Sequence, residues 1–472
     1  MASGFRSKLV RLCEILRDPH HVASFQRYCG VRGTFCRDSL NGHRHCRAEG
    51  EAADRQGRGE GETGDCNGRG DGEAEDRKGR VEGEAGDAPW RGKHAAADGV
   101  PNGLGKCVAR ETVRLRGASA ENGDGGSKTP TCASAVKPRR RNSLTGDDGQ
   151  EFLIENKLLY YLFTFGTELG NELFYITFFP FFIWNIDPYV GRRLILVWVW
   201  VMYLGQCTKD LIRWSRPASP PVVKVEMFYN SEYSMPSTHA MSGTAIPFSL
   251  FLLTYGRWEY PMPLGLVLAL SWCVLVCLSR IYMGMHSILD VIAGILYSAL
   301  ILLLFYPALD VVDTFNQTCP YAPLAIISLH LGLGLFSFTL DTWSTSRGDT
   351  AQILGTGAGI ALGAHLNRRL GLLPDPSQWQ LPFSPPPFSA ALLAGTVLRL
   401  LLGVVVLLAT RTAMKAVTIP VICRLVGVPS HDVRQARQHM EVELPYRYIV
   451  YSTVGFNCFF LVPFLFSYVG LC

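Results

Sequence analysis

Three groups of polar residues stand out in the otherwise strongly apolar second part of this 472-residue sequence. They are Lys209 with Arg216 and Pro217, then Pro236, Ser237, Thr238 and His239, and finally Ser279 and Arg280 with His286 and Asp290. Lysine and arginine side chains bind the non-bridging oxygens of a phosphate monoester and stabilise the charge of its transition state. We therefore predict that Lys209, Arg216 and Arg280 bind a phosphate group.

The two histidines could supply the rest of a phosphoryl-transfer reaction. Asp290 lies four residues after His286, so on a helix its carboxylate would orient one ring nitrogen and leave the other to attack phosphorus. His239 is predicted to protonate the departing alkoxide. Ser237 and the backbone N–H of Thr238, at the start of a helix, would add donors where the helix dipole favours an anion.

Taken singly, these residues have ordinary structural interpretations. Lysine and arginine at the ends of membrane helices usually extend toward lipid headgroups, and one histidine there is more often structural than catalytic. Asp290 inside an apolar run is more informative, since a carboxylate in that setting requires a partner. The ordered combination of all three groups favours the catalytic interpretation.

The composition divides the chain into unlike regions. Residues 1–30 contain apolar side chains at helical spacing among arginines, which predicts an amphipathic helix suited to a membrane surface. Residues 31–150 are rich in Gly and charge, which predicts a disordered tail. Residues 151–472 are predicted to form a membrane domain. The 48% hydrophobic content and net charge of +5 average these regions and do not indicate nucleic-acid binding. The 14 cysteines lack metal-ligand spacing, and we expect neither metal nor cofactor.

Repeated apolar stretches predict an all-α, polytopic membrane helical bundle with about eight or nine segments. The stretches are 158–184, 194–208, 239–255, 263–279, 287–306, 322–340, 348–364, 389–409 and 448–470. Because successive spans alternate in direction, the three polar groups at their ends are expected to meet at one membrane face. Gly355, Gly359 and Gly363 recur at four-residue spacing, which predicts close packing against another helix.

The ordered motifs resemble those of the type 2 phosphatidate phosphatase and vanadium haloperoxidase superfamily. The resemblance implies a metal-independent phosphatase with a helical core and a phosphohistidine intermediate on His286, oriented by Asp290. It also implies that His239 protonates the leaving group, and that Lys209, Arg216, Ser237 and Arg280 bind phosphate. Thr238 departs from the pattern, which usually has Gly there; its side chain would narrow the pocket and alter the fit of the substrate.

From about residue 140 onward the chain also looks like the sphingosine-1-phosphate phosphatases of the endoplasmic reticulum, most strongly over 142–182 and 229–290. This resemblance implies a sphingoid base phosphate as substrate, alongside membrane lipids as surroundings, and an active site facing the lumen. The oligomeric state stays open. Alternative predictions are a broad lipid phosphate phosphatase, a sugar phosphate phosphatase, or a membrane scaffold or transporter that retains a phosphate pocket.

Orientation raises a conflict with the basic run Arg139–Arg141, which favours the cytosol for the start of the membrane domain. We predict that stretch 158–184, interrupted by Glu168 and Glu172, enters the membrane and turns back, which would leave the active site lumenal. Glu168, Glu172 and Asp341 would then approach the active-site face. A carboxylate there could recognise the ammonium group of a sphingoid base, although internal pairing or helix capping is the more ordinary interpretation.

Overall fold

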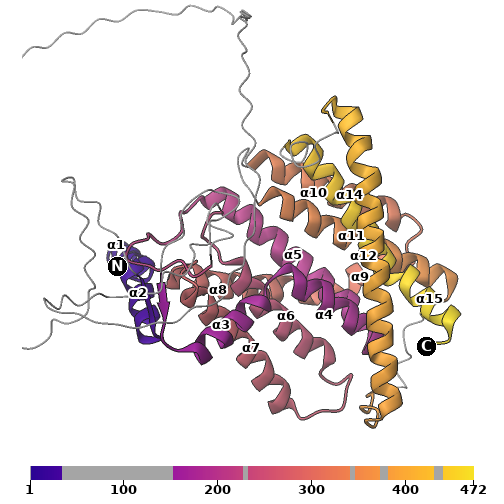
Figure 1. The fold of residues 1–472 in the computed structure, drawn as a ribbon, viewed down its shortest axis with the longest axis horizontal. Coiled ribbons are helices and arrows are strands. Elements are labelled where there is room, and N and C mark those ends of the chain that lie inside the picture. Colours follow the sequence, from indigo (N-terminus) through magenta and orange to yellow (C-terminus); the bar gives the residue numbers. More distant parts are fainter. Residues whose placement is uncertain are drawn as a thin grey trace, which may run out of the picture. The chain divides into compact units, whose positions relative to one another are not determined.

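The computed structural model describes residues 2–33, 152–226, 232–340, 346–372, 381–429 and 439–471. Most of them are helical (Figure 1), which confirms the predicted helical bundle; the strands are limited to one short pair. The predicted tail, from residue 34 to its end and including Arg139–Arg141, lies outside the described residues. Asp341 lies outside them as well.

The N-terminal residues form two helices rather than one. Helix α1 (Ala2–Arg17) is followed by α2 (Pro19–Tyr28), and the side chain of Asp18 between them caps α2 by accepting from the N–H of His20. Strand β1 (Val31–Gly33) then pairs antiparallel with β2 (Phe152–Ile154), with Val31 opposite Ile154. Residues 31–33, predicted to belong to the tail, are therefore part of the folded protein.

The stretch predicted to turn back is broken into α3 (Lys157–Glu168) and α4 (Glu172–Asn185). Phe152 and the start of α3 pack around Met283 and Met285, beyond the end of α7 (Met262–Tyr282). Asp187, just after α4, binds Arg257, which precedes the start of α7. The segment thus runs from one end of the bundle to the other, so the prediction that it turns back is wrong. The polar residues that suggested a turn mark a helix break instead.

Helix α5 (Pro188–Ile212) lies at the centre of the bundle, in contact with α4, α6, α8, α10 and α11. It is apolar on all sides from Leu194 to Met202 and is buried almost continuously from Val190 to Met202, as expected for a helix enclosed by others. Asp187 caps its N-terminus. Helix α6 (Thr238–Thr254) and α8 (Ile288–Phe305) pack beside it. The C-terminal part of α5 lies near the N-terminus of α6, because Gly205 lies against Thr238. The N-terminus of α6 is joined to that of α8 by the bond from the N–H of Ser237 to the carbonyl of Asp290.

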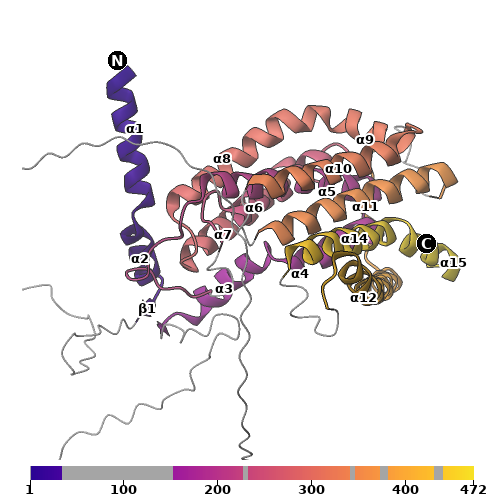
Figure 2. The ribbon, with the colours of Figure 1, turned by 90° about the horizontal axis from the view of Figure 1, so that it is seen from above.

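The chain after α8 adds a second group of helices. These are η1 (Tyr306–Ala308), α9 (Leu309–Thr318), α10 (Ala322–Leu340), α11 (Arg347–Leu370), α12 (Ala390–Val426), α14 (Met440–Phe459) and α15 (Leu461–Val469). In Figure 2, α10, α11 and α14 lie side by side, and α11 makes its most extensive contact with α14. Gly355 and Gly359 face the backbone of Tyr448 and Ser452 there, so the predicted close helix packing is confirmed.

Six segments among the described residues are long and apolar enough to cross a membrane. They are Pro188–Ile212, Met262–Tyr282, Ile288–Thr318, Ala322–Leu340, Ala390–Val426 and Met440–Val469. The chain is therefore a multi-pass membrane protein, but the predicted count of eight or nine segments is not confirmed. Helices α4 and α6 are only 14 and 17 residues long, and α11 begins with Arg347 and Asp349 and is largely covered by other helices.

Candidate active site

A cavity of about 220 Å³ lies at the end of the bundle where α5 ends and α6 begins. Six of the predicted catalytic and phosphate-binding residues line it: Lys209, Arg216, Thr238, His239, Arg280 and His286. Asp290 and Ser237 are buried but do not line it. These six residues come from all three polar groups, so the structure brings the groups together as the alternation of the helices predicts.

His286 lies between α7 and α8, immediately before Ser287, which caps α8. Its Nε2 is 3.4 Å from the Nη1 atom of Arg216, inside the cationic part of the cavity. A guanidinium can only donate, so Nε2 is the unprotonated nitrogen and Nδ1 carries the proton. His286 therefore presents its lone pair to the position that a phosphate group would occupy.

Asp290 does not contact the ring of His286 directly. Its Oδ2 is 3.9 Å from Nδ1, because His286 precedes the helix and the i+4 geometry of a regular helix does not apply. Ser234 lies between them: its hydroxyl donates to Asp290 Oδ2 at 2.6 Å and lies 3.4 Å from His286 Nδ1. The N–H of Ser287 donates to the same carboxylate oxygen at 2.8 Å. Asp290 thus orients His286 through Ser234.

Burial is the main reason that the pKa of His286 lies well below its ordinary range, and the positive charges of Arg216 and Arg280 lower it further. The side chain is only 1% exposed. His286 is consequently neutral at neutral pH, which is the form that can act as a nucleophile.

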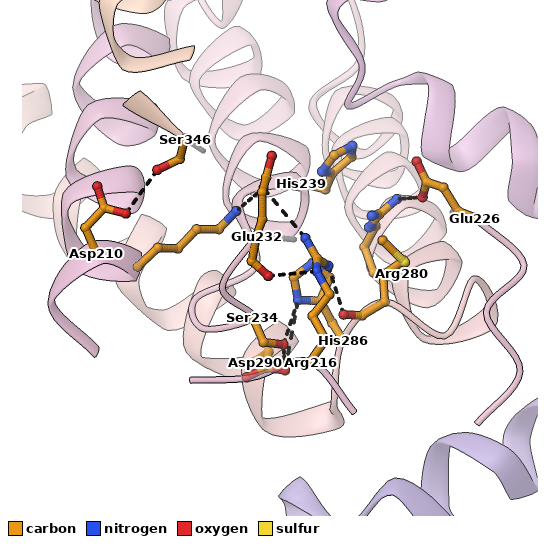
Figure 3. A network of polar contacts seen from close by, with 12 residues as sticks. Asp210, Arg216, Glu226, Glu232, Ser234, His239, Arg280, His286, Asp290 and Ser346 are labelled. Carbon is orange, nitrogen blue, oxygen red and sulfur yellow. Dashed lines mark hydrogen bonds and ion pairs between the residues drawn. The ribbon is translucent and has the colours of Figure 1, made fainter. Parts of the chain in front are cut away.

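Each predicted phosphate-binding cation is paired with a carboxylate from the loop between α5 and α6 (Figure 3). Lys209 Nζ lies 3.1 Å from Glu232 Oε2, and an Nη2 of Arg216 lies 3.6 Å from the same oxygen. Arg280 Nη1 donates to Glu226 at 2.9 Å. Burial alone would raise the pKa of Glu232, but Lys209 and Arg216 outweigh it and hold that pKa below its ordinary value. Glu232 therefore lies as an anion against two of the side chains that would hold phosphate.

His239 lies in the first turn of α6 and points into the cavity. Its Nε2–H donates to Asn171 Oδ1 at 2.9 Å, from the break between α3 and α4. A side chain at Gly170 would collide with the same ring, since a Cβ there would lie 2.4 Å from it. The polar break in the stretch predicted to turn back thus serves to position His239.

Ser237 has a structural role in addition to any contact with substrate. Its side chain caps α6 by accepting from the N–H of Ala240, and its own N–H donates to the backbone carbonyl of Asp290 at 3.1 Å. This second contact joins the start of α6 to the first turn of α8. Its predicted contact with phosphate stays a prediction.

The cavity continues as an apolar channel between α4, α5, α11, α12 and α14. Its apolar lining includes Phe179, Ile195, Trp198, Ile360 and Leu407. Among the residues proposed for ammonium recognition, Glu172 lines the cavity and accepts from the hydroxyl of Tyr451 at 2.8 Å. Glu168 is exposed and does not line it. The cavity can therefore accommodate a phosphate group at one end and a hydrocarbon chain beyond it.

Ser234, Glu232 and Asn171 are site residues that the sequence motifs did not identify. Ser234 and Glu232 lie in a loop without periodicity, although Ser234 is only two residues before the motif that starts at Pro236. Asn171 lies between Glu168 and Glu172, the two residues that interrupt stretch 158–184 in the sequence. Among the described residues, no group of three or more His, Cys, Asp or Glu side chains could hold a metal ion.

This arrangement of cations and histidines at the ends of buried helices agrees with a comparison of the sequence with known families. The PAP2 superfamily model matches residues 191–311, which extend from α5 into α9. The chain is 56% identical to Sphingosine-1-phosphate phosphatase 1 of Rattus norvegicus, over 98% of this chain and 99% of the relative. It is 38% identical to Sphingosine-1-phosphate phosphatase 2 of Homo sapiens, over 80% and 94% of the two chains. The chain therefore belongs to the sphingosine-1-phosphate phosphatase family. No solved structure matches it.

Proposed function

We propose that this protein is a phosphoric monoester hydrolase that converts sphingosine 1-phosphate and related sphingoid base phosphates to the free base and phosphate. One observation carries the proposal: the unprotonated Nε2 of His286 faces three cationic side chains at one end of a cavity whose other end is apolar. A lipid phosphate fits this cavity, because its phosphate group suits the cationic end and its hydrocarbon chain suits the apolar end.

The reaction proceeds in two steps. His286 Nε2 attacks phosphorus while Lys209, Arg216 and Arg280 hold the non-bridging oxygens and stabilise their charge. The bond from phosphorus to the lipid oxygen breaks, and His239 donates a proton to that oxygen. In the second step His239 removes a proton from water, the water oxygen attacks the phosphohistidine, and the bond between phosphorus and Nε2 breaks to release phosphate. Thr238 and Ser237 would contribute donors at the start of α6.

The decisive experiment is phosphate release from sphingosine 1-phosphate by the purified protein in detergent with a chelator present. We expect turnover in the wild type, a trapped phosphoenzyme after quenching in alkaline detergent, since phosphohistidine is labile in acid, and loss of both in His286→Ala. His365→Ala is the matched control, because that buried histidine binds the backbone of Asn316 far from the cavity. Dependence on added metal, or full activity of His286→Ala, would contradict the proposed mechanism.

The same assay separates the alternative functions. The apolar channel favours a lipid over a sugar phosphate, so glucose 6-phosphate should be a poor substrate. Comparable turnover of phosphatidate would instead indicate a broad lipid phosphate phosphatase. A scaffold or transporter would bind phosphate without releasing it from any ester.

Recognition of the substrate's ammonium group by a carboxylate is part of this proposal. Of Glu168, Glu172 and Asp341, we retain Glu172, because it lines the cavity. Its carboxylate is also 3.4 Å from Arg411, which competes for the same charge. Glu172→Gln should lower the preference for an amine-bearing phosphate if the assignment is right, and unchanged preference would remove it.

We further propose that the protein resides in the endoplasmic reticulum membrane with its active site facing the lumen, and that α1 rests on the membrane surface. Exposed Leu12 and Ile15 on α1 support the second point. Arg368 and Arg369 are exposed at the end of the bundle opposite the cavity, as expected for a cytosolic end. In sealed microsomes of a cysteine-free variant, an impermeant thiol reagent should label Arg368→Cys but not Leu153→Cys. The reverse pattern would place the site in the cytosol.

A further inference from the structure

The charges around the phosphate position do not suit a simple phosphate monoester. Lys209, Arg216 and Arg280 face two carboxylates, Glu226 and Glu232, in pairs with little exposure to solvent. These five groups carry a net charge of +1. A phosphate monoester adds a charge of about −1.5 to −2 at neutral pH. Binding such a ligand would therefore leave uncompensated negative charge in a buried site, which is unfavourable.

A substrate that carries its own positive charge next to the phosphate restores the balance. Glu232 is the carboxylate placed to meet such a charge, because it lines the cavity and lies against both Lys209 and Arg216. Its side chain is only 12% exposed, so water compensates little for a lost partner. Glu226 pairs with Arg280 but does not line the cavity, and Glu172 is already bonded to Tyr451.

Arg280 provides independent evidence that an anionic ligand belongs here. The residue is 1% exposed and lines the cavity, yet its Nε–H has no hydrogen-bond partner among the described residues. A buried guanidinium donor without an acceptor is costly. A phosphate oxygen would supply that acceptor and would compete with the loop carboxylates for the same cations.

We propose that Glu232 determines the substrate specificity: phosphate displaces it from Lys209 and Arg216, and its carboxylate then pairs with the ammonium group that a sphingoid base carries beside its phosphate. The inference rests on the proposed phosphatase function. Glu232 then has two roles. In the empty site its carboxylate competes with phosphate for Lys209 and Arg216, and in the complex it binds the ammonium group of the correct substrate. A phosphate ester without an amine displaces Glu232 and offers it no new partner.

The test compares kcat/KM of the full-length protein for sphingosine 1-phosphate, ceramide 1-phosphate and lysophosphatidate in matched mixed micelles. Ceramide 1-phosphate retains the nitrogen as a neutral amide, and lysophosphatidate lacks it. In Glu232→Gln we expect the preference for sphingosine 1-phosphate over both other lipids to fall by about tenfold or more, as for loss of a largely desolvated ion pair. Inhibition by inorganic phosphate should become stronger, because its internal competitor is lost.

Glu259→Gln is the matched control and should change neither quantity, because that exposed carboxylate lies outside the cavity and accepts from Ser384. Glu172→Gln tests another carboxylate that lines the cavity. Glu232→Asp keeps the negative charge but shortens the side chain by one methylene, so this variant should retain part of the preference for sphingosine 1-phosphate. Its activity also shows whether the loop tolerates substitution at this position. An unchanged preference in Glu232→Gln, an equal loss on all three lipids, or loss of preference in Glu172→Gln alone would overturn the assignment. Failure of the wild type to release phosphate from sphingosine 1-phosphate would instead refute the proposed function.

Discussion

His286 Nδ1 and Asp290 Oδ2 lie 3.9 Å apart, and the hydroxyl of Ser234 connects them. The hydroxyl accepts from the ring and donates to the carboxylate, so it fixes the tautomer in which Nε2 is free to attack. The backbone N–H of Ser234 is itself held by the carbonyl of Trp214 at 2.7 Å. Orientation of the nucleophile therefore depends on the loop between α5 and α6 as well as on α8.

Removal of the Ser234 hydroxyl should impair catalysis more than binding. Ser234→Ala leaves the Nδ1–H of His286 without a near acceptor, a penalty of about 1–3 kcal/mol for a buried group. We expect kcat to fall by about 10- to 100-fold with little change in KM. Ser234→Thr, which keeps the hydroxyl, should recover part of the loss. A change confined to KM, or no recovery in Ser234→Thr, would contradict this role.

The lowered pKa of His286 should make stability depend on pH. In the unfolded chain a histidine has a pKa of about 6.5. Between that value and the lower pKa of the folded protein, the unfolded state binds a proton that the folded state does not. Stability should therefore fall as pH falls through this interval, by up to about 1.4 kcal/mol per pH unit for one group.

Thermal unfolding in detergent between about pH 7.5 and 5.5 measures this effect. The loss of Tm toward acid should be smaller in His286→Asn than in the wild type, because asparagine does not titrate. Parallel pH dependences in the two proteins would show that folding does not lower the pKa of His286. The conservative size of asparagine limits other changes to packing.

The N-terminal helix α2 should be required for activity. Gln26 is 1% exposed and donates to the carbonyls of Val223 and Tyr282, and it accepts from the N–H of Val223. It thus joins the loop after α5 to the C-terminal end of α7, the helix that carries Arg280. Gln26→Ala should lower stability by about 1–3 kcal/mol and reduce kcat/KM. Arg27→Ala is the control, since that exposed side chain bonds only locally to Ser24; equal effects in both variants would exclude a specific role for Gln26.

Contact between α11 and α14 should be sensitive to single methyl groups. A Cβ at Gly359 would lie 2.0 Å from the carbonyl oxygen of Ser452, and backbone atoms cannot move aside cheaply. Gly359→Ala should therefore lower Tm in detergent by several degrees. Gly332→Ala, with no atom within 4 Å of the added Cβ, should leave Tm unchanged or raise it slightly. A neutral Gly359→Ala would mean that the two helices separate easily.

The sequence identified the predicted catalytic and phosphate-binding residues better than it identified the residues that position them. Lys209, Arg280 and His286 follow an ordered motif, and alternation of helices is enough to place them on one face. Ser234 and Glu232 lie in a loop, where side-chain positions depend on contacts distant in sequence. The i+4 spacing also predicted a direct contact between Asp290 and His286 that does not form. His286 precedes the first residue of α8, so the two side chains do not share a helix face.

Helix boundaries showed the same limit. The predicted stretch 389–409 continues well beyond its expected end, as the single helix α12 with Pro420 inside it. Stretch 158–184 instead breaks at Gly170 and Asn171 because those residues contact His239. Hydropathy indicates whether a segment is buried in an apolar environment. It does not reveal whether a polar residue in that segment ends a helix or contacts a neighbouring active-site residue.

Because β1 pairs with β2, the segment that connects them can vary in length without disturbing the folded catalytic part of the protein. Val31 and Ile154 are partners across the strands, so the two ends of the segment that joins β1 to β2 lie side by side. Everything between them is topologically an insertion at the tip of a hairpin. Such a position tolerates deletion, expansion or fusion of a foreign domain at small cost in loop entropy. This protein therefore offers a natural attachment point for an affinity handle or a fluorescent reporter next to a membrane-embedded enzyme.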